Sequence, residues 1–157
     1  MKLILVGKAA SGKDHLKKRV EDKGFKSGIS YTTRPPRQTE KEGEDYYFVT
    51  EERFDQIIES GEMLEWMEFN NWKYGLSIEE FEKADVMIMS KDGLDMLPKE
   101  YRDRCLVIYL DIPRMTRVKR LNDRNDINDS IWRRMSTDDD QFDKFSDFDI
   151  RIKNDDF

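Results

Sequence analysis

The chain has 157 residues, with 28 lysines and arginines against 34 aspartates and glutamates, and a formal net charge of -6. A chain of this length forms one domain whose core needs no disulfide or metal support. The acidic balance argues against a general polyanion binder, and no apolar run reaches the length of a membrane span, so neither nucleic acid nor a membrane is expected as a partner. The single cysteine, Cys105, cannot form an internal disulfide, which predicts a reducing, cytoplasmic compartment.

Short apolar runs alternate with stretches of helical periodicity along much of the chain. The runs Leu3–Val6, Val86–Met89 and Leu106–Leu110 predict buried strands. The other predicted elements of this part are a helix that ends near Gly24, helices at Arg114–Arg124 and Ile127–Asp143, and a last strand within Phe148–Ile152. This alternation predicts an α/β fold in three layers, with a parallel sheet covered by helices on both faces.

Residues 30–75 break this alternation and are rich in aromatic side chains. The strands predicted here are Tyr46–Val49, Met63–Phe69 and Trp72–Tyr74, the last two joined by a tight Asn-Asn turn. Thr50 is a candidate N-cap for a helix over Glu51–Ser60, and Ser77 begins a capping-box pattern for a shorter helix. The block therefore predicts a small antiparallel insertion. The aromatic side chains expected to form its own core are Trp66, Trp72, Phe69 and Tyr47, and the alternative is that they form a stacking platform.

A glycine-rich segment follows the first predicted strand and precedes the first predicted helix. Its sequence, GKAASGK over residues 7–13, matches the phosphate-loop pattern G-x-x-x-x-G-K. Glycines let the backbone curl so that successive N–H groups point at a phosphate, and the helix N-terminus adds a positive field. The phosphate-binding residues predicted here are Gly7, Ala9, Ala10, Ser11, Gly12 and Lys13, with Lys13 reaching the β- and γ-phosphates of a nucleotide. The alternative is an ordinary glycine turn.

The position after Lys13, usually Ser or Thr in this motif, is Asp14. A carboxylate about 4 Å from a phosphate charge is repelled by roughly 4 kcal/mol at an effective dielectric of about 20, unless a cation lies between them. Because Mg²⁺ prefers oxygen ligands, Asp14 is a candidate magnesium ligand, direct or through water. The alternative is that Asp14 only stabilises the first helical turn through the helix dipole.

Two arginines, Arg34 and Arg37, flank a pair of prolines. Their guanidinium groups can converge on one phosphate as bidentate donors, and the prolines lower the entropy cost of holding them there. Hydroxyl groups of Ser30, Tyr46 and Tyr74 could complete such a cradle. The alternative is a solvated basic loop beside an aromatic cluster.

These blocks, in this order and spacing, resemble guanylate kinase, an ATP-dependent nucleoside monophosphate kinase. The resemblance covers nearly the whole chain and is most specific over Ser30–Phe48. It implies a P-loop kinase core over residues 1–29, 84–118 and 144–157, an acceptor-binding insertion over 30–83 and a helical lid over about 119–143. It also implies phosphorylation of GMP or dGMP by ATP, with Mg²⁺ as cofactor, in a monomer or homodimer.

The resemblance assigns roles to individual residues. The residues implied to bind the acceptor nucleotide are Ser30, Arg34, Arg37, Tyr46, Glu65, Tyr74 and Ser90. Glu65 would accept hydrogen bonds from the guanine N1–H and 2-amino groups, since a carboxylate offers two acceptor oxygens. The residues implied in catalysis are Lys13, Arg34 and the lid arginines Arg120, Arg124 and Arg134, and Asn154, in an Asn-Asp-Asp turn, would lie near the adenine.

Two positions depart from the family pattern. Leu76 stands where the family has a Ser or Thr that addresses the guanine O6, with Ser77 one residue later, and Ser90 stands where it has an acidic residue. A kinase for another deoxy or modified nucleotide, or for a phosphorylated sugar, is therefore an alternative. A non-catalytic module that binds phosphorylated peptides is another.

Overall fold

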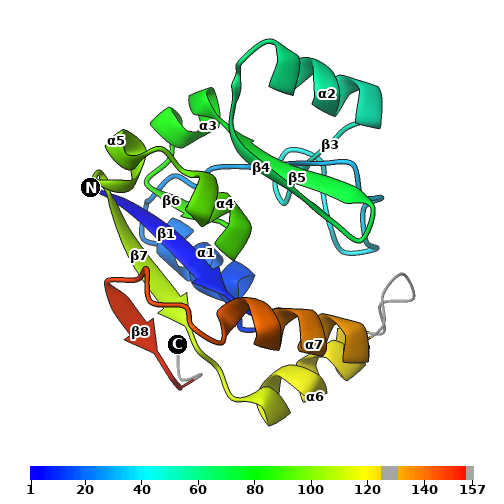
Figure 1. Cartoon of the computed structure of the whole chain (residues 1–157), viewed down its shortest axis with the longest axis vertical. Coiled ribbons are helices and arrows are strands. Elements are labelled where there is room, and N and C mark those ends of the chain that lie inside the picture. The colour runs from blue at the N-terminus through cyan, green and yellow to red at the C-terminus, as the bar shows by residue number, and fades with distance from the viewer. Residues whose placement is uncertain (125–130, 155–157) are drawn as a thin grey trace.

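The computed structural model describes residues 1–124 and 131–154, without the side chains of residues 131–134. The core is a parallel sheet in the order β6-β1-β7-β8. Its strands are β1 (Lys2–Gly7), β6 (Val86–Ile88), β7 (Cys105–Leu110) and β8 (Ile150–Ile152). The helices are α1 (Lys13–Glu21), α2 (Glu51–Glu59), α3 (Ile78–Lys83), α4 (Lys91–Met96), α5 (Lys99–Arg102), α6 (Arg114–Arg124) and α7 (Ile131–Phe142). Figure 1 shows the strands of this sheet side by side.

Side chains of β1 alternate between the two faces of the parallel sheet, which is why the strand is almost uniformly apolar. Ile4 and Val6 belong to one core cluster, to which α3, α4 and α7 contribute Phe81, Leu94 and Phe142. The opposite face contains Leu5 and is covered by apolar residues of α1. The predicted α/β fold with helices on both faces is confirmed.

A second sheet has the order β3-β2-β5-β4. Its strands are β2 (Tyr31–Thr32), β3 (Tyr47–Phe48), β4 (Met63–Phe69) and β5 (Trp72–Ser77). Asn70 and Asn71 form the β4–β5 turn with φ of 56° and 63°, a conformation that asparagine tolerates well. The predicted N-cap of α2 is confirmed, since the Thr50 hydroxyl accepts a hydrogen bond from the Arg53 N–H at 3.2 Å.

The prediction of a small antiparallel insertion is wrong for one strand pair. Strands β2 and β3 pair in parallel, because residues 33–46 between them form a connection long enough to return the chain in the same direction. Helices α4 and α5 and strand β2 were not predicted. These elements have six, four and two residues, too few to establish a period, and α4 contains a glycine. The start of the helix predicted from Ile127 lies outside the described residues, which place α7 from Ile131.

Helices α6 and α7 pack on the segment between β1 and α1. Ala10, Leu121 and Met135 form a small buried cluster there. The buried Arg117 of α6 donates from Nε to the Ile112 carbonyl at 3.1 Å and lies 3.5 Å from Asp139 of α7. These contacts fix α7 over the loop that follows β1, next to the second sheet.

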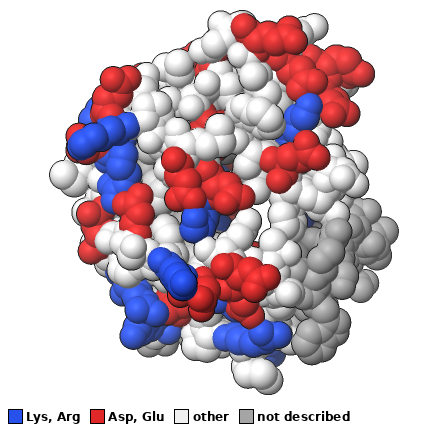
Figure 2. Space-filling view, in the orientation of Figure 1, with Lys and Arg blue, Asp and Glu red and all other residues white. Residues whose placement is uncertain are grey.

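The charged surface is mixed. On the face in Figure 2 acidic side chains gather at the top, where Figure 1 places α2 with its exposed Glu51 and Glu52, and basic and acidic groups are interspersed below. No helix in residues 1–124 or 131–154 combines the length and the apolar character needed to cross a membrane.

Candidate active site

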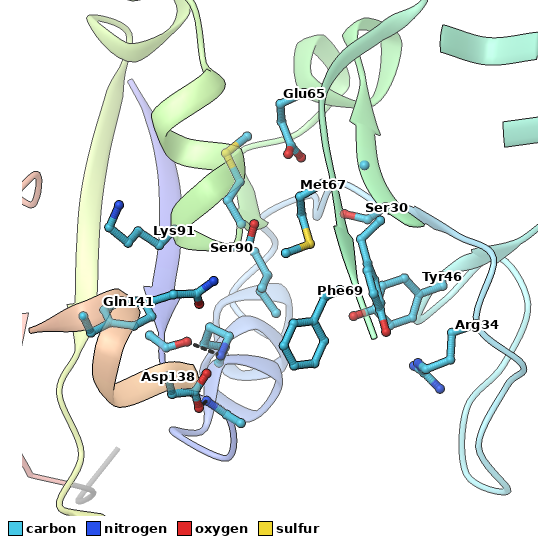
Figure 3. Close-up of a pocket in the computed structure, with 18 of the residues that line it drawn as sticks. Ser30, Arg34, Tyr46, Glu65, Met67, Phe69, Ser90, Lys91, Asp138 and Gln141 are labelled. Atoms are coloured by element: carbon cyan, nitrogen blue, oxygen red, sulfur yellow. Dashed lines mark hydrogen bonds between the residues drawn. The ribbon is translucent and has the colours of Figure 1, made fainter. Parts of the chain in front are cut away.

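A cavity of about 210 Å³ lies where the β1–α1 loop, the second sheet and helices α4 and α7 meet. The predicted site residues that line it are Gly7, Ala9, Lys13, Ser30, Arg34, Arg37, Tyr46, Glu65, Tyr74 and Ser90. Figure 3 shows Ser30, Tyr46 and Arg34 on one side, Asp138 and Gln141 on the other, and Glu65 above them. The fold therefore brings both predicted phosphate-binding segments to one cavity.

The β1–α1 loop is held in a tight curl by its own backbone. Ala10 and Gly12 both have positive φ, 58° and 94°, and the Ser11 N–H donates to the Lys8 carbonyl at 3.2 Å. A Cβ at Gly7 would lie 2.8 Å from the Leu110 carbonyl oxygen of β7, which is too close for any side chain. The end of β1 can therefore approach β7 this closely only because residue 7 is glycine. The Lys13 ammonium donates to the Gly7 and Lys8 carbonyls at 2.7 and 3.0 Å.

Helices α6 and α7 contact this loop through polar groups. The Ala9 N–H donates to the Asp138 carboxylate of α7 at 2.7 Å, and Lys8 pairs with Asp139 at 2.8 Å. Arg120 donates to the Ala10 carbonyl at 3.1 Å. The Asp138 carboxylate therefore accepts a hydrogen bond from a loop N–H. In a phosphate loop, such N–H groups donate to phosphate oxygens. The sequence analysis did not find Asp138, because nothing local links it to a loop 129 residues away.

Arg34 and Arg37 converge on the same carboxylate, that of Glu40. Arg34 donates to both Glu40 oxygens at 2.8 and 2.9 Å, and Arg37 donates from its backbone N–H at 2.8 Å and its guanidinium at 3.3 Å. Burial alone would lower the pKa of Arg34, but its bonds to Glu40 raise it. Burial alone would raise the pKa of Glu40, but bonds from the two arginines hold it below its usual range. The sequence analysis missed Glu40, although an acid three residues after Arg37 was a local signal for this pairing.

The tyrosines complete the arginine side of the cavity. The Arg34 guanidinium lies 5.4 Å from the Tyr46 ring centre, and the Tyr46 and Tyr74 rings pack edge to face at 6.3 Å. Burial raises the pKa of the Tyr46 hydroxyl to about 12, and the Asp14 carboxylate adds to this rise. Tyr46 therefore stays a neutral hydrogen-bond donor at physiological pH.

Asp14 lies in the first turn of α1 and is exposed. It lines a neighbouring groove together with Glu44 and Asp45 rather than the main cavity. The described residues contain no cluster of three His, Cys, Asp or Glu side chains arranged to hold a metal ion. The Asp14 carboxylate beside the β1–α1 loop fits Mg²⁺, which is commonly bound by one or two carboxylates, substrate phosphates and water.

Glu65 forms the buried end of the cavity. Its side chain is 5% exposed and accepts a hydrogen bond from the Leu76 backbone N–H, and burial raises its pKa to about 7. Met67 and Phe69 of the same strand also line the cavity, so Phe69 is not confined to the core of the insertion. Ser90, at the edge of the cavity, accepts a hydrogen bond from the Gly93 N–H at 2.9 Å.

The positions that depart from the family pattern have other partners. Leu76 is fully buried in the core cluster that contains Ile4 and Val6 of β1. The Ser77 hydroxyl is the N-cap of α3 and accepts a hydrogen bond from the Glu80 N–H at 3.2 Å. Neither side chain lines the cavity.

Other predicted site residues lie around the cavity rather than in its wall. Ala10, Ser11 and Gly12 form the back of the loop, and the Ser11 side chain is buried. Arg124 is exposed at the end of α6, and Asn154 is exposed after β8. The Arg134 side chain and the rest of the Asn-Asp-Asp turn, Asp155–Phe157, lie outside the described residues.

Comparison with known proteins identifies the family. A guanylate kinase family model matches residues 1–157. The guanylate kinase of Legionella pneumophila (strain Paris) is 34% identical over 164 residues, covering 98% of this chain and 78% of that protein. The chain belongs to the guanylate kinase family. The guanylate kinase of Helicobacter pylori (strain ATCC 700392 / 26695) is 41% identical over 113 residues, covering 67% of this chain and 55% of that protein.

The fold agrees with that of a solved guanylate kinase. The crystal structure of guanylate kinase from Anaplasma phagocytophilum matches with a TM-score of 0.74 at 23% identity, covering 99% of this chain and 77% of that chain. Guanylate kinases are nucleoside monophosphate kinases, so the predicted family, fold class and enzyme class are confirmed. Family membership also favours the kinase over the phosphopeptide-binding alternative.

Proposed function

We propose that this protein transfers the γ-phosphoryl group of ATP to GMP or dGMP in the cavity described above. The observation that carries the proposal is that one cavity is lined by the phosphate loop, by Arg34 and Arg37, and by the buried carboxylate of Glu65. A phosphoryl donor and a phosphorylated acceptor can therefore meet there. We infer that residues 30–83 form the acceptor-binding unit and that residues 119–143 form the lid.

The reaction is an in-line displacement. An oxygen of the acceptor phosphate forms a bond to the γ-phosphorus, the bond from that phosphorus to the β,γ-bridging oxygen breaks, and ADP leaves. Because the second pKa of a phosphate monoester is about 6, the attacking oxygen already carries its charge at neutral pH and needs no general base. The chain's task is to position the two anions and neutralise their charge.

Each side of the cavity would hold one anion. On the donor side, N–H groups of the β1–α1 loop and the Lys13 ammonium would hold the ATP phosphates. The lid arginines Arg120, Arg124 and Arg134 would close over these phosphates, and Asn154 would lie near the adenine.

On the acceptor side, the residues that would hold the acceptor phosphate are Arg34, Arg37, Tyr46, Tyr74 and Ser30. Arg34 has five N–H groups, three of which donate to Glu40 and Pro35, so two remain for the phosphate among the contacts described.

Asp14 would hold Mg²⁺ directly or through water. The ion would neutralise charge on the ATP phosphates when bound. A magnesium titration of Asp14→Ser tests this assignment, since serine restores the usual residue of the motif. We expect near-normal activity with a changed magnesium dependence, and an unchanged dependence would favour the helix-dipole interpretation.

Glu65 would read the base. Its carboxylate can accept hydrogen bonds from the guanine N1–H and 2-amino groups, while Met67 and Phe69 supply apolar contact area beside it. Adenine offers an acceptor at N1, where a carboxylate finds no donor.

The single buried Cys105 and the use of ATP fit a cytoplasmic enzyme.

A coupled ADP-release assay with ATP and Mg²⁺ tests the function directly. We expect turnover with GMP and dGMP and at least tenfold lower kcat/KM with AMP and dTMP, because a missing partner for a buried polar group costs about 1–3 kcal/mol. Turnover of dTMP or a phosphorylated sugar without turnover of GMP would contradict the proposal.

One observation favours a broader acceptor range as the second candidate. Leu76 is buried and the Ser77 hydroxyl caps α3, so neither offers a hydroxyl to the guanine O6. Selection then rests mainly on Glu65. Including IMP and modified guanine nucleotides in the assay tests whether discrimination is weaker at O6 than at the N1 and 2-amino groups.

A further inference from the structure

Helix α4 approaches the Glu65 carboxylate through a residue without a side chain. A Cβ placed on Gly93 would lie 2.2 Å from Glu65 Oε2 and 2.9 Å from Glu65 Cδ. Both distances are far below van der Waals contact, so the carboxylate keeps its present position only while residue 93 is glycine. A milder contact, 3.2 Å, would form with the Ser90 hydroxyl oxygen, so the severe crowding is with the far end of the Glu65 side chain and with no backbone atom.

The first turn of α4 is itself held firmly. The Ser90 hydroxyl caps it by accepting the Gly93 N–H at 2.9 Å, and Gly93 is buried. On the other side, Glu65 is tied to β5 by the Leu76 backbone N–H. Glycine is among the weakest helix formers. Helix formation therefore does not explain why residue 93 is glycine. The close approach of the Glu65 carboxylate does explain it, because no side chain fits between them.

We propose that Gly93 is a positioning residue for base selection, because its missing side chain seats the Glu65 carboxylate against the base of the acceptor nucleotide. The inference rests on the proposed function, in which Glu65 reads that base. Any side chain at position 93 pushes the carboxylate toward the cavity or into another rotamer. The base then meets misplaced acceptor oxygens while the phosphate-binding residues stay in place.

The Gly93→Ala variant tests this. We expect the KM for GMP to rise roughly ten- to a hundredfold, as for loss of a charge-assisted hydrogen bond. The KM for ATP should stay within about twofold, because α4 lies on the acceptor side. The melting temperature should be unchanged or higher, since alanine favours a helix more than glycine.

Base preference gives a readout that a merely structural role would not move. Guanine offers two donors to Glu65 and hypoxanthine offers one, so the ratio of kcat/KM for GMP over IMP should fall in Gly93→Ala. Gly61→Ala is the matched control, because a Cβ there meets no atom within 4 Å and only the positive φ of 76° is affected. That variant should melt earlier and keep its KM for GMP.

A double-mutant cycle shows whether Gly93 acts through Glu65. Glu65→Asp shortens the side chain by one carbon–carbon bond, about 1.5 Å, and removes the crowding. We expect Gly93→Ala to cost less than about threefold in the Glu65→Asp background, compared with tenfold or more in the wild type.

Three results would overturn this inference and leave the proposed function standing. The first two are an unchanged KM for GMP in Gly93→Ala, and equal losses for GMP and IMP in a variant that also melts earlier. An additive cycle would show that Gly93 does not act through Glu65 and would also overturn it. A wild-type protein that does not phosphorylate GMP would instead remove the proposed function, and this inference with it.

Discussion

The β1–α1 loop and the loop that carries Arg34 and Arg37 each contact a carboxylate of the protein, but the two carboxylates are held in different ways. Glu40 belongs to the same loop as Arg34 and Arg37 and accepts hydrogen bonds from both. Asp138 belongs to α7 and accepts the Ala9 N–H of a loop 129 residues away. Glu40 is part of the loop whose groups it holds, whereas Asp138 reaches the β1–α1 loop from a separate helix. We therefore expect the Glu40 charge to support phosphate binding by the arginines and the Asp138 charge to compete with a phosphate for the Ala9 N–H.

This difference predicts opposite effects on removal of the two carboxylates. Without Glu40, the arginines lose the group that orients them. Without Asp138, the loop N–H becomes available to a phosphate at no cost. The variants below test each side of the cavity, beginning with the residue whose loss is expected to matter most.

Lys13→Ala should reduce kcat by roughly a hundred- to a thousandfold, because it removes the fixed positive charge that would stabilise the phosphoryl group during its transfer. Steady-state kinetics at saturating ATP and GMP measure this loss. Lys8→Ala is the matched control, since Lys8 lies in the same loop but pairs with Asp139. It should lose less than tenfold.

Acceptor binding should survive the Lys13 change. Calorimetric titration of Lys13→Ala with GMP should give a Kd within about twofold of the wild type, since the acceptor phosphate is proposed to bind the loop that carries Arg34 and Arg37. Retained kcat in this variant would contradict the assignment of the phosphate loop.

Glu40→Gln should destabilise the protein by about 3 kcal/mol, because it leaves the buried guanidinium of Arg34 without its counter-charge. For a chain of this size, that corresponds to a fall of roughly 6–12 °C in melting temperature. GMP should recover part of the loss, since its phosphate would pair with the arginines. Glu44→Gln is the control: its pair with Lys41 is mostly exposed and contributes little.

The effect of Glu40 should also depend on pH. Its pKa is lowered in the folded state, so the stabilisation is present above its ordinary pKa and is lost as the pH falls through the lower folded value. The melting difference between wild type and Glu40→Gln should therefore shrink in acid. A difference that persists unchanged at low pH would show that the ion pair is not its cause.

The sequence predicted those parts of the site that lie within a few residues of one another. The phosphate loop is one continuous motif, and the β4 range was predicted as the structure has it, because Met63–Phe69 is bounded by a glycine and an asparagine turn. The contacts Asp138–Ala9 and Glu65–Gly93 depend on how distant helices dock. No local pattern encodes that docking, so both were missed.

Glu65 makes the base end of the cavity sensitive to pH in a way that Glu40 does not. Burial raises its pKa to about 7, so between the ordinary value near 4.5 and about 7 the folded state retains a proton that the unfolded state has released. Stability should therefore fall as the pH rises through this window, by up to roughly 3 kcal/mol. Glu65→Gln should not show this fall.

Melting temperatures of the two proteins between pH 5 and 8 measure the effect. Glu68→Gln serves as the control because Glu68 is exposed on the same strand. Parallel profiles for wild type and Glu65→Gln would show that the buried carboxylate is not the source of the pH dependence.

Asp138→Asn should give the smallest change, and in the opposite direction to the variants on the arginine side. The variant replaces a charge-assisted hydrogen bond from the Ala9 N–H by a weaker neutral one and removes a negative charge beside the ATP phosphates, a change of about 1 kcal/mol, so the Kd for ATP should fall about fivefold. Because this gain comes from the protein without ATP, that form should melt slightly earlier, and saturating ATP should close the gap. Asp139→Asn is the control: both aspartates lie within 4 Å of the buried Arg117, but Asp139 pairs with Lys8 and Arg114 rather than with the Ala9 N–H, so this variant should melt earlier without binding ATP more tightly. A Kd for ATP that is unchanged or higher in Asp138→Asn would mean that the carboxylate stays in place when ATP binds, and the contrast with Glu40 would fail.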